Sequence, residues 1–295
     1  MRLREGRTIF AMGDHQVEDI IRHIKNFIKP LLSREMLESY YRFRHQRHFA
    51  QSSVVPFAKI LVTGSSGFIG RTITPYLSQC GFSLRGYDRE PAAGPEEFIQ
   101  GDLLDFTTLS HAAQGADCII HLAASPHFAD FESQLVPSNV LGLHNILEAA
   151  RLAGVKRIIL ASSCQAAFLH EKQKRVRVND RSPLGHYGLT KLWGEEMGQL
   201  YSRRYGLSVL AVRLGWAVNS PAEFENMATS AEGRPLFLSH DDLRELFRCS
   251  LYARPTPFDV VYAFSKQEPE IYDMKPAKRL LGFRPRDTYP HGLDF

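Results

Sequence analysis

From residue 59 onward, short apolar runs alternate with segments whose apolar residues recur every three or four positions. The apolar runs predict strands at about 59–63, 82–88, 97–100, 117–122, 157–163 and 208–214, with a late strand at Phe258–Phe264. The periodic segments predict helices at about 68–79, 106–114, 132–153, 185–205 and 241–252, with a short helix near Pro276–Leu281. Strand–helix alternation of this kind predicts an α/β fold with a doubly wound parallel sheet. Residues 59–295 form that domain, and a small C-terminal substrate lobe lies mainly in 216–295.

Residues 1–58 have a different pattern and predict a basic, amphipathic helical extension. They contain ten Lys and Arg against six Asp and Glu, which accounts for the whole net charge of +4. Apolar residues from Val17 to Leu31 recur at helical spacing, with charged residues between them. The favoured interpretation is a helical hairpin packed on the catalytic domain or on a second subunit. Peripheral membrane contact through residues 17–48 is the alternative, and no nucleic-acid reader motif is present.

The first candidate site is the glycine loop that joins the first predicted strand to the first predicted helix. Gly64, Gly67 and Gly70 follow Lys59–Thr63 directly. Gly64 suits a tight turn, Gly67 lets the backbone approach a pyrophosphate, and Gly70 lets the helix pack closely on the strand. The following helix start offers free N–H groups to phosphates. The loop therefore predicts a Rossmann-like dinucleotide site.

A second motif, Tyr187-x-x-x-Lys191, predicts the chemistry. Residues four apart share one helix face, so both side chains can enter one cleft. A lysine ammonium near a phenol lowers the phenol pKa, and the phenolate can then take a hydroxyl proton while hydride leaves the same carbon. Ser163 ends a buried strand, where its hydroxyl could hold the reacting oxygen. We therefore assign Ser163, Tyr187 and Lys191 as catalytic residues.

With these motifs in view, the chain resembles an extended short-chain dehydrogenase/reductase of the NAD-dependent epimerase/dehydratase superfamily, from Lys59 to about Asp287. The resemblance implies an oxidoreductase that binds NAD. It implies cofactor contacts from Tyr187, Lys191 and thirteen further residues: Gly64, Ser66, Gly67, Phe68, Ile69, Gly70, Asp88, Asp102, Leu103, Leu122, Ala123, Ala124 and Asn139. Asp88 follows the second strand, where a carboxylate favours NAD over NADP, although the neighbouring Arg89 could pair with a 2′-phosphate. Asp102 could equally serve only to form a Gly-Asp turn.

Late segments such as Leu238–Asp242 and Leu281–Asp287 are similar to uronate dehydrogenases, which oxidise C1 of a cyclic uronic acid. The resemblance implies substrate contacts from Ser125, Ser163, Arg213, Trp216 and Asn226. Those enzymes hold the substrate carboxylate with an arginine just before a methionine, where this chain has Asn226 before Met227. Arg234, in a later loop, is the alternative cation for this contact. A neutral sugar or polyol is therefore credible beside a sugar acid.

Two other functions stay open. A nucleotide-sugar epimerase or dehydratase would use the same residues and return the hydride, although Cys164 and Gln165 after Ser163 argue against a dehydratase. A non-catalytic NAD-binding scaffold or redox sensor is the alternative of a different class, and the intact Ser163, Tyr187 and Lys191 argue against it.

Composition narrows the setting further. Four scattered cysteines, no apolar run of about 20 residues and no signal-peptide pattern predict a cytoplasmic protein, with homodimerisation through the long helices. No metal-ligand spacing is present: His121 reads as a structural residue, and His240, beside the helix-capping Ser239, reads as a surface residue. Cys164 reads as a packed cysteine at a strand end.

Overall fold

A computed structural model describes residues 57–294, except for 92–93, 169–174, 231–232 and 268–269. The N-terminal extension lies outside the described residues. The hairpin and membrane-contact interpretations of residues 17–48 therefore stay predictions.

Seven parallel strands form one sheet in the order β3-β2-β1-β4-β5-β6-β7. The strands are β1 (Ile60–Thr63), β2 (Leu84–Asp88), β3 (Glu97–Gln100), β4 (Cys118–His121), β5 (Arg157–Ser163), β6 (Ser208–Leu214) and β7 (Phe258–Ala263). Each predicted strand is confirmed, with ends that differ by two residues at most. The strand order reverses between β1 and β4, and a doubly wound sheet opens a ligand crevice at such a point, outside the carboxyl ends of its strands.

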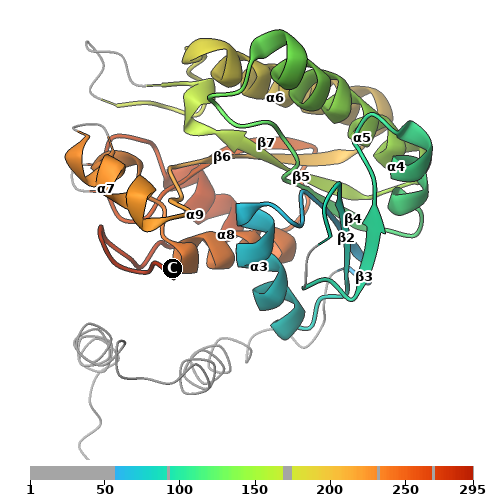
Figure 1. The fold of residues 1–295 in the computed structure, drawn as a ribbon, viewed down its shortest axis with the longest axis horizontal. Helices are drawn as coiled ribbons and strands as arrows, with labels where there is room; N and C mark the ends of the chain where they lie inside the picture. Colours follow the sequence, from blue (N-terminus) through green and yellow to red (C-terminus); the bar gives the residue numbers. More distant parts are fainter. Residues whose placement is uncertain (1–56, 92–93, 169–174, 231–232, 268–269, 295) are drawn as a thin grey trace, which may run out of the picture. The chain divides into compact units, whose positions relative to one another are not determined.

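Helices cover both faces of this sheet (Figure 1). Helices α4 (Phe106–Ala113), α5 (Leu143–Leu152) and α6 (Gly185–Tyr205) lie on one face. Helices α3 (Phe68–Gln79), α8 (His240–Tyr252) and α9 (Lys275–Leu281) lie on the other. Helix α7 (Pro221–Thr229) and two short 3₁₀ turns, η4 (Cys164–Ala166) and η5 (Arg234–Leu236), lie in the loops that follow β5 and β6.

Burial on both faces follows from the alternation of side chains along each strand. Ile60 and Val62 belong to the hydrophobic cluster that includes Ile73 of α3, whereas Leu61 between them belongs to the cluster that includes Ile146 of α5. The whole of β1 is buried, as expected for an inner strand of a parallel sheet. These two hydrophobic clusters, one on each face, fix the strands and therefore the carboxyl edge of the sheet, where the candidate site lies.

The helix predicted at 132–153 is not continuous α-helix. Its first part, η3 (Phe131–Gly142), is π-helical and leads directly into α5. Pro137 lies inside η3, and proline lacks the N–H that α-helical hydrogen bonding requires while its ring crowds the carbonyl four residues earlier. The apolar periodicity predicted a helix over this segment, but it did not predict the switch from π-helical to α-helical hydrogen bonding at Leu143.

Candidate functional site

The glycine loop has the geometry that a dinucleotide cradle needs. Gly64 has φ of +74°, and a Cβ there would lie 2.5 Å from the backbone nitrogen of Ala123. A Cβ on Gly70 would lie 2.3 Å from the carbonyl oxygen of Gly64, so α3 packs directly on the loop. Both predicted roles are confirmed. Helix α3 begins after Gly67 with no side-chain cap, which leaves its first N–H groups free for a phosphate.

Asp88 at the end of β2 holds this loop in place. Its Oδ2 accepts a hydrogen bond from the backbone N–H of Ser66 at 3.0 Å, and its Oδ1 accepts one from Arg89 at 2.7 Å. The Arg89 guanidinium lies 4.0 Å from the carboxylate of Asp102, so the negative charge of Asp102 partly compensates the positive charge of Arg89. Asp102 also forms the expected turn, because its Oδ1 accepts the N–H of Leu104 at 2.8 Å. Ribose and adenine contacts by Asp88 and Asp102 stay predictions.

The apolar cofactor candidates surround the same edge. Leu122, Ala123 and Ala124 follow β4, and Ala123 faces Gly64. The ring of Phe68 contacts His240 edge-on, with centroids 5.2 Å apart. Ile69 packs against the α3-side core, and Leu103 is buried in the α5-side core. The structure therefore brings these segments together around the crevice.

The three catalytic candidates also converge. Ser163 ends β5, and its hydroxyl oxygen accepts the N–H of Gln165 at 3.1 Å. Tyr187 lies in the first turn of α6, close enough to the Ser163 side chain for the serine to lower the pKa of the phenol. The Nζ of Lys191 lies 5.5 Å from the centre of the Tyr187 ring and donates a hydrogen bond of 2.9 Å to the carbonyl of Ala161. The Ser163 hydroxyl, the Tyr187 phenol and the Lys191 ammonium therefore lie close together at the carboxyl edge of the sheet.

Burial controls the protonation of these groups. It lowers the pKa of Lys191 to about 8, because a charged ammonium loses hydration. It raises the pKa of the Tyr187 phenol above its usual range, with a further rise from Cys164, while the hydrogen bond with Ser163 lowers it. Lys191 is not among the groups that lower the Tyr187 pKa here. The expected lowering stays a prediction for the complex with oxidised nicotinamide, whose positive charge adds to that of lysine.

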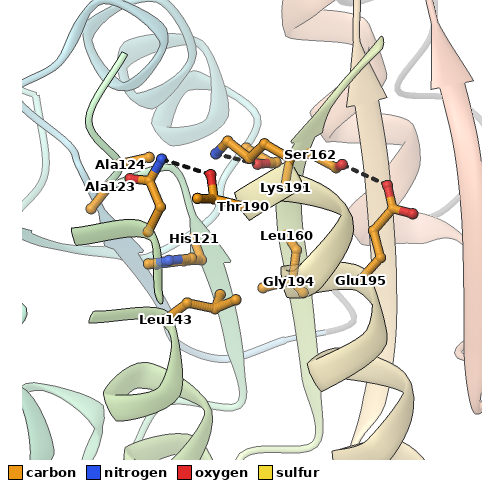
Figure 2. A pocket seen from close by; sticks show the side chains of 12 residues that line it. His121, Ala123, Ala124, Leu143, Leu160, Ser162, Thr190, Lys191, Gly194 and Glu195 are labelled. Atoms are coloured by element: carbon orange, nitrogen blue, oxygen red, sulfur yellow. Dashed lines mark hydrogen bonds between the residues drawn. The ribbon is translucent and has the colours of Figure 1, made fainter. Parts of the chain in front are cut away.

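Asn139 clamps the loop after β4 to α6. Its Oδ1 accepts the N–H of Ser125 at 2.8 Å, and its Nδ2 donates to the carbonyl of Ser125 and to the hydroxyl of Thr190, both at 3.2 Å. A small cavity of about 20 Å³, large enough for about one water molecule, has Asn139, Thr190 and Lys191 in its lining (Figure 2). Asn139 therefore shapes the site by fixing the backbone of Ser125. The sequence did not indicate that Thr190 would be a hydrogen-bond partner of Asn139.

The structure corrects the substrate role expected of Arg213. Only 1% of its surface is exposed, and its Nε and Nη2 donate to the two carboxylate oxygens of Glu195, each at 2.8 Å. Its Nη1 donates to the hydroxyl of Tyr262 at 2.8 Å. A guanidinium neutralised in this way inside the protein does not face substrate. Glu195 was missed from the sequence, although it lies one turn after Lys191 on the same helix.

The late substrate candidates, Trp216, Asn226 and Arg234, lie beyond the end of β6. The backbone of Trp216 pairs with η5, with its N–H donating to Leu236 at 2.6 Å, and its half-buried ring packs against the cluster around Phe237. Asn226 lies on α7, exposed next to the buried Met227. Arg234 packs beside the same helix: its Nη2 lies 3.5 Å from the Ala228 carbonyl.

His240 is a second correction, because it is buried rather than on the surface. Its Nε2 hydrogen-bonds the Val218 carbonyl at 2.8 Å, and its Nδ1 accepts the N–H of Asp294 at 3.0 Å. Ser239 caps α8 as expected, through the N–H of Asp242 at 3.0 Å. Both nitrogens of the ring are occupied by the backbone, which fixes the tautomer and ties the C-terminal segment to the loop after β6.

The remaining candidates have structural environments. Burial lowers the pKa of His121 to about 3, and its Nδ1 hydrogen-bonds the hydroxyl of Thr63 at 2.7 Å. Burial raises the pKa of Cys164 to about 12, which confirms a packed, unreactive thiol. Among the described residues, no group of three or more His, Cys, Asp or Glu is arranged to hold a metal ion, and no helix is both long and apolar enough to cross a membrane.

Comparison with known proteins agrees with this site. A sequence profile of the NAD dependent epimerase/dehydratase family matches residues 60–228. Uronate dehydrogenase of Pseudomonas putida is 33% identical over 241 residues, covering 80% of this chain and 87% of that protein. L-arabinose 1-dehydrogenase (NAD(P)(+)) of Haloferax volcanii is 28% identical over 253 residues, covering 78% of this chain and 97% of that protein.

Solved structures give the same result. The crystal structure of uronate dehydrogenase from Agrobacterium tumefaciens superposes with a TM-score of 0.69 at 30% identity, and covers 78% of this chain and 85% of that one. The uncapped start of α3, the close packing at Gly64 and the convergence of Ser163, Tyr187 and Lys191 fit a dinucleotide cofactor. The chain therefore belongs to the NAD-dependent epimerase/dehydratase family and is an NAD-dependent oxidoreductase.

Proposed function

We propose that the protein oxidises the C1 hydroxyl of a free cyclic sugar or sugar acid to the lactone. The observation that supports this most is the convergence of Ser163, Tyr187 and Lys191 at the edge where the glycine loop ends. When bound in the glycine-loop cradle, NAD would supply the acceptor for the hydride of C1. The hydroxyl proton passes to the Tyr187 oxygen, and the C–H and O–H bonds are replaced by the second bond of a carbonyl, so that one hydride and one proton leave together.

Each residue has a distinct part in this step. Ser163 holds the reacting oxygen, because it ends β5 next to Tyr187 and its hydroxyl can donate to that oxygen while it accepts the N–H of Gln165. Lys191 supplies positive charge beside the phenol, fixed in place by the Ala161 carbonyl. With a pKa of about 8, lysine carries that charge at neutral pH. A phenolate at Tyr187 is thereby favoured once the nicotinamide adds its own charge.

Recognition of a sugar acid needs a cation, and Arg234 is the described residue best placed to supply it. Arg213 is neutralised by Glu195, and residue 226 is an asparagine. The η5 turn that carries Arg234 pairs with Trp216, directly after β6, and therefore lies at the carboxyl edge of the sheet. The exposed Arg234 guanidinium also packs over the ring of Tyr289, 5.3 Å from its centre, next to α7. We assign the carboxylate contact to Arg234.

The test is NADH formation on a panel of uronic acids, neutral aldoses and nucleotide sugars. Wild-type protein should form NADH with a free sugar or sugar acid, and Tyr187→Phe should lower kcat by about 10²- to 10⁴-fold, the usual worth of a positioned acid–base group. Conversion of a nucleotide sugar without net NADH would replace this proposal with an epimerase. NAD binding without turnover of any sugar would support the scaffold alternative.

A second variant separates acid from neutral substrates. Arg234→Met should raise KM for uronic acids by about 10- to 100-fold, the worth of one charge-assisted hydrogen bond, and leave KM for neutral aldoses unchanged. Arg175→Met, which removes an arginine paired with Glu270, serves as the control. Equal effects of Arg234→Met on both substrate classes would exclude the carboxylate contact.

A further inference from the structure

Helix α6 carries Tyr187 and Lys191, yet its own sequence fixes its place only weakly. It contains four glycines, at positions 185, 188, 194 and 198, and glycine disfavours a helix interior. The helix begins after Leu184 with no side-chain cap and with no acidic residue in its first turn. The position of its catalytic end must therefore come from contacts with the rest of the protein.

One carboxylate provides an unusually directional contact. Glu195 lies one turn after Lys191 and only 3% of it is exposed. Its Oε1 accepts the hydroxyl of Ser162 at 2.6 Å and the Nε of Arg213 at 2.8 Å, while its Oε2 accepts Nη2 of the same arginine. Figure 2 shows Glu195 reaching from α6 toward Ser162. A bidentate pair of this kind fixes orientation as well as distance.

The two partners of Glu195, Ser162 and Arg213, lie in one row across the sheet together with Tyr262. Ser162 of β5 pairs in register with Arg213 of β6, which pairs in register with Tyr262 of β7. The Arg213 Nη1 also donates to the Tyr262 hydroxyl at 2.8 Å, so the guanidinium is held at both ends. The carboxylate of α6 therefore binds directly to β5 and β6, and through Arg213 it is linked to β7; both charged side chains are almost fully buried.

We propose that Glu195, together with Arg213, is a positioning residue for the reaction: it sets where α6 places Tyr187 and Lys191 relative to Ser163. Ser162 is the chain neighbour of Ser163, and Glu195 is one helical turn from Lys191. The link thus joins the strand that carries the serine to the helix that carries the phenol and the ammonium. The proposal rests on the proposed function of Ser163, Tyr187 and Lys191.

The decisive variant removes both charges together, Glu195→Leu with Arg213→Met. Loss of one partner leaves an unpaired buried charge that unfolds proteins, whereas apolar replacement of both partners is often tolerated. We expect the thermal midpoint to stay near that of wild type and KM for the sugar to change less than about threefold. Turnover, kcat, should fall about 100-fold, the cost of a misplacement of about 1 Å.

A matched pair elsewhere serves as the control. Glu245 and Arg248 form an ion pair within α8, and Glu245→Leu with Arg248→Met should leave kcat at the wild-type value. If the Glu195 and Arg213 variant does not fold, Ser162→Ala decides instead. It removes one hydrogen bond to Glu195 and keeps the ion pair, and we expect kcat to fall about tenfold. The loss of one buried hydrogen bond should lower the thermal midpoint by only a few degrees, so the variant stays folded in the assay.

The pH profile of kcat provides a readout that a purely structural role would not move. Displacement of Tyr187 from Ser163 and Lys191 should shift its apparent pKa upward in both variants. Wild-type kcat and pH profile in both variants would overturn the positioning role. Full activity of Tyr187→Phe would instead overturn the proposed function itself, and the two failures are therefore distinguishable.

Discussion

The buried ammonium of Lys191 should lower the unfolding free energy of the protein at neutral pH. Burial lowers its pKa from 10.5 to about 8, so the folded state binds a proton less readily than the unfolded chain does. These two pKa values correspond to about 3 kcal/mol of lost unfolding free energy at pH 7. This cost is fully present below the folded-state pKa and disappears as the pH rises toward the unfolded-state value. At pH 9.5 the same relation leaves about 1 kcal/mol.

Lys191→Met removes the charge and keeps a long apolar stem. It also loses the hydrogen bond to the Ala161 carbonyl, which contributes about 1 kcal/mol. The variant without cofactor should therefore gain about 2 kcal/mol of unfolding free energy at pH 7 and almost nothing at pH 9.5. Activity should be lost at both pH values, because the positive charge beside Tyr187 is gone.

Urea unfolding at pH 7 and at pH 9.5 measures both gains. Lys156→Met is the control: this lysine is 72% exposed and pairs with Asp117, and its removal should not stabilise the protein at either pH. Destabilisation of Lys191→Met at pH 7 would refute the reasoning. A gain of equal size at both pH values would also refute it, since only a titrating lysine makes the gain depend on pH.

Two further predictions concern the cofactor loop and the start of α8. Gly64→Ala should raise the NAD dissociation constant measured by calorimetry more than tenfold, because the added Cβ would clash with the backbone of Ala123. The control is Gly154→Ala: Gly154 has a similar φ of +69° but open space around it, so this change should leave NAD binding unchanged. Burial and the charge of Asp287 raise the pKa of Asp242, so its contribution to stability is present at low pH and is lost as the pH rises through the folded-state pKa. Asp242→Asn loses one of the two backbone N–H groups that the carboxylate accepts, from Arg286 and Asp287, at every pH. The change in thermal midpoint should therefore be more favourable to the variant at pH 8 than at pH 5, and equal midpoint changes at both pH values would contradict this.

Local sequence patterns predicted most of the fold, because their physical causes are local. The strands lie between two cores and are apolar throughout, so continuous apolar runs locate them. The glycine loop was predictable because Gly64 and Gly70 have steric requirements that no other residue meets. The spacing of Tyr187 and Lys191 placed both on one helix face, and the end of β5 placed Ser163 beside them. These are relations between residues that are near in sequence or fixed by strand order.

The errors concern residues whose environment is decided by distant partners. Nothing around Arg213 in the sequence shows that Glu195, eighteen residues earlier and on a helix, takes both of its donors. His240 appears exposed between polar neighbours until Val218 and Asp294 occupy its two nitrogens. A charged or polar side chain can face substrate only after its buried partners are known. For the same reason we propose Arg234 for the carboxylate contact: Asn226 of α7 carries no charge, and the tertiary structure places Arg234 beside that helix.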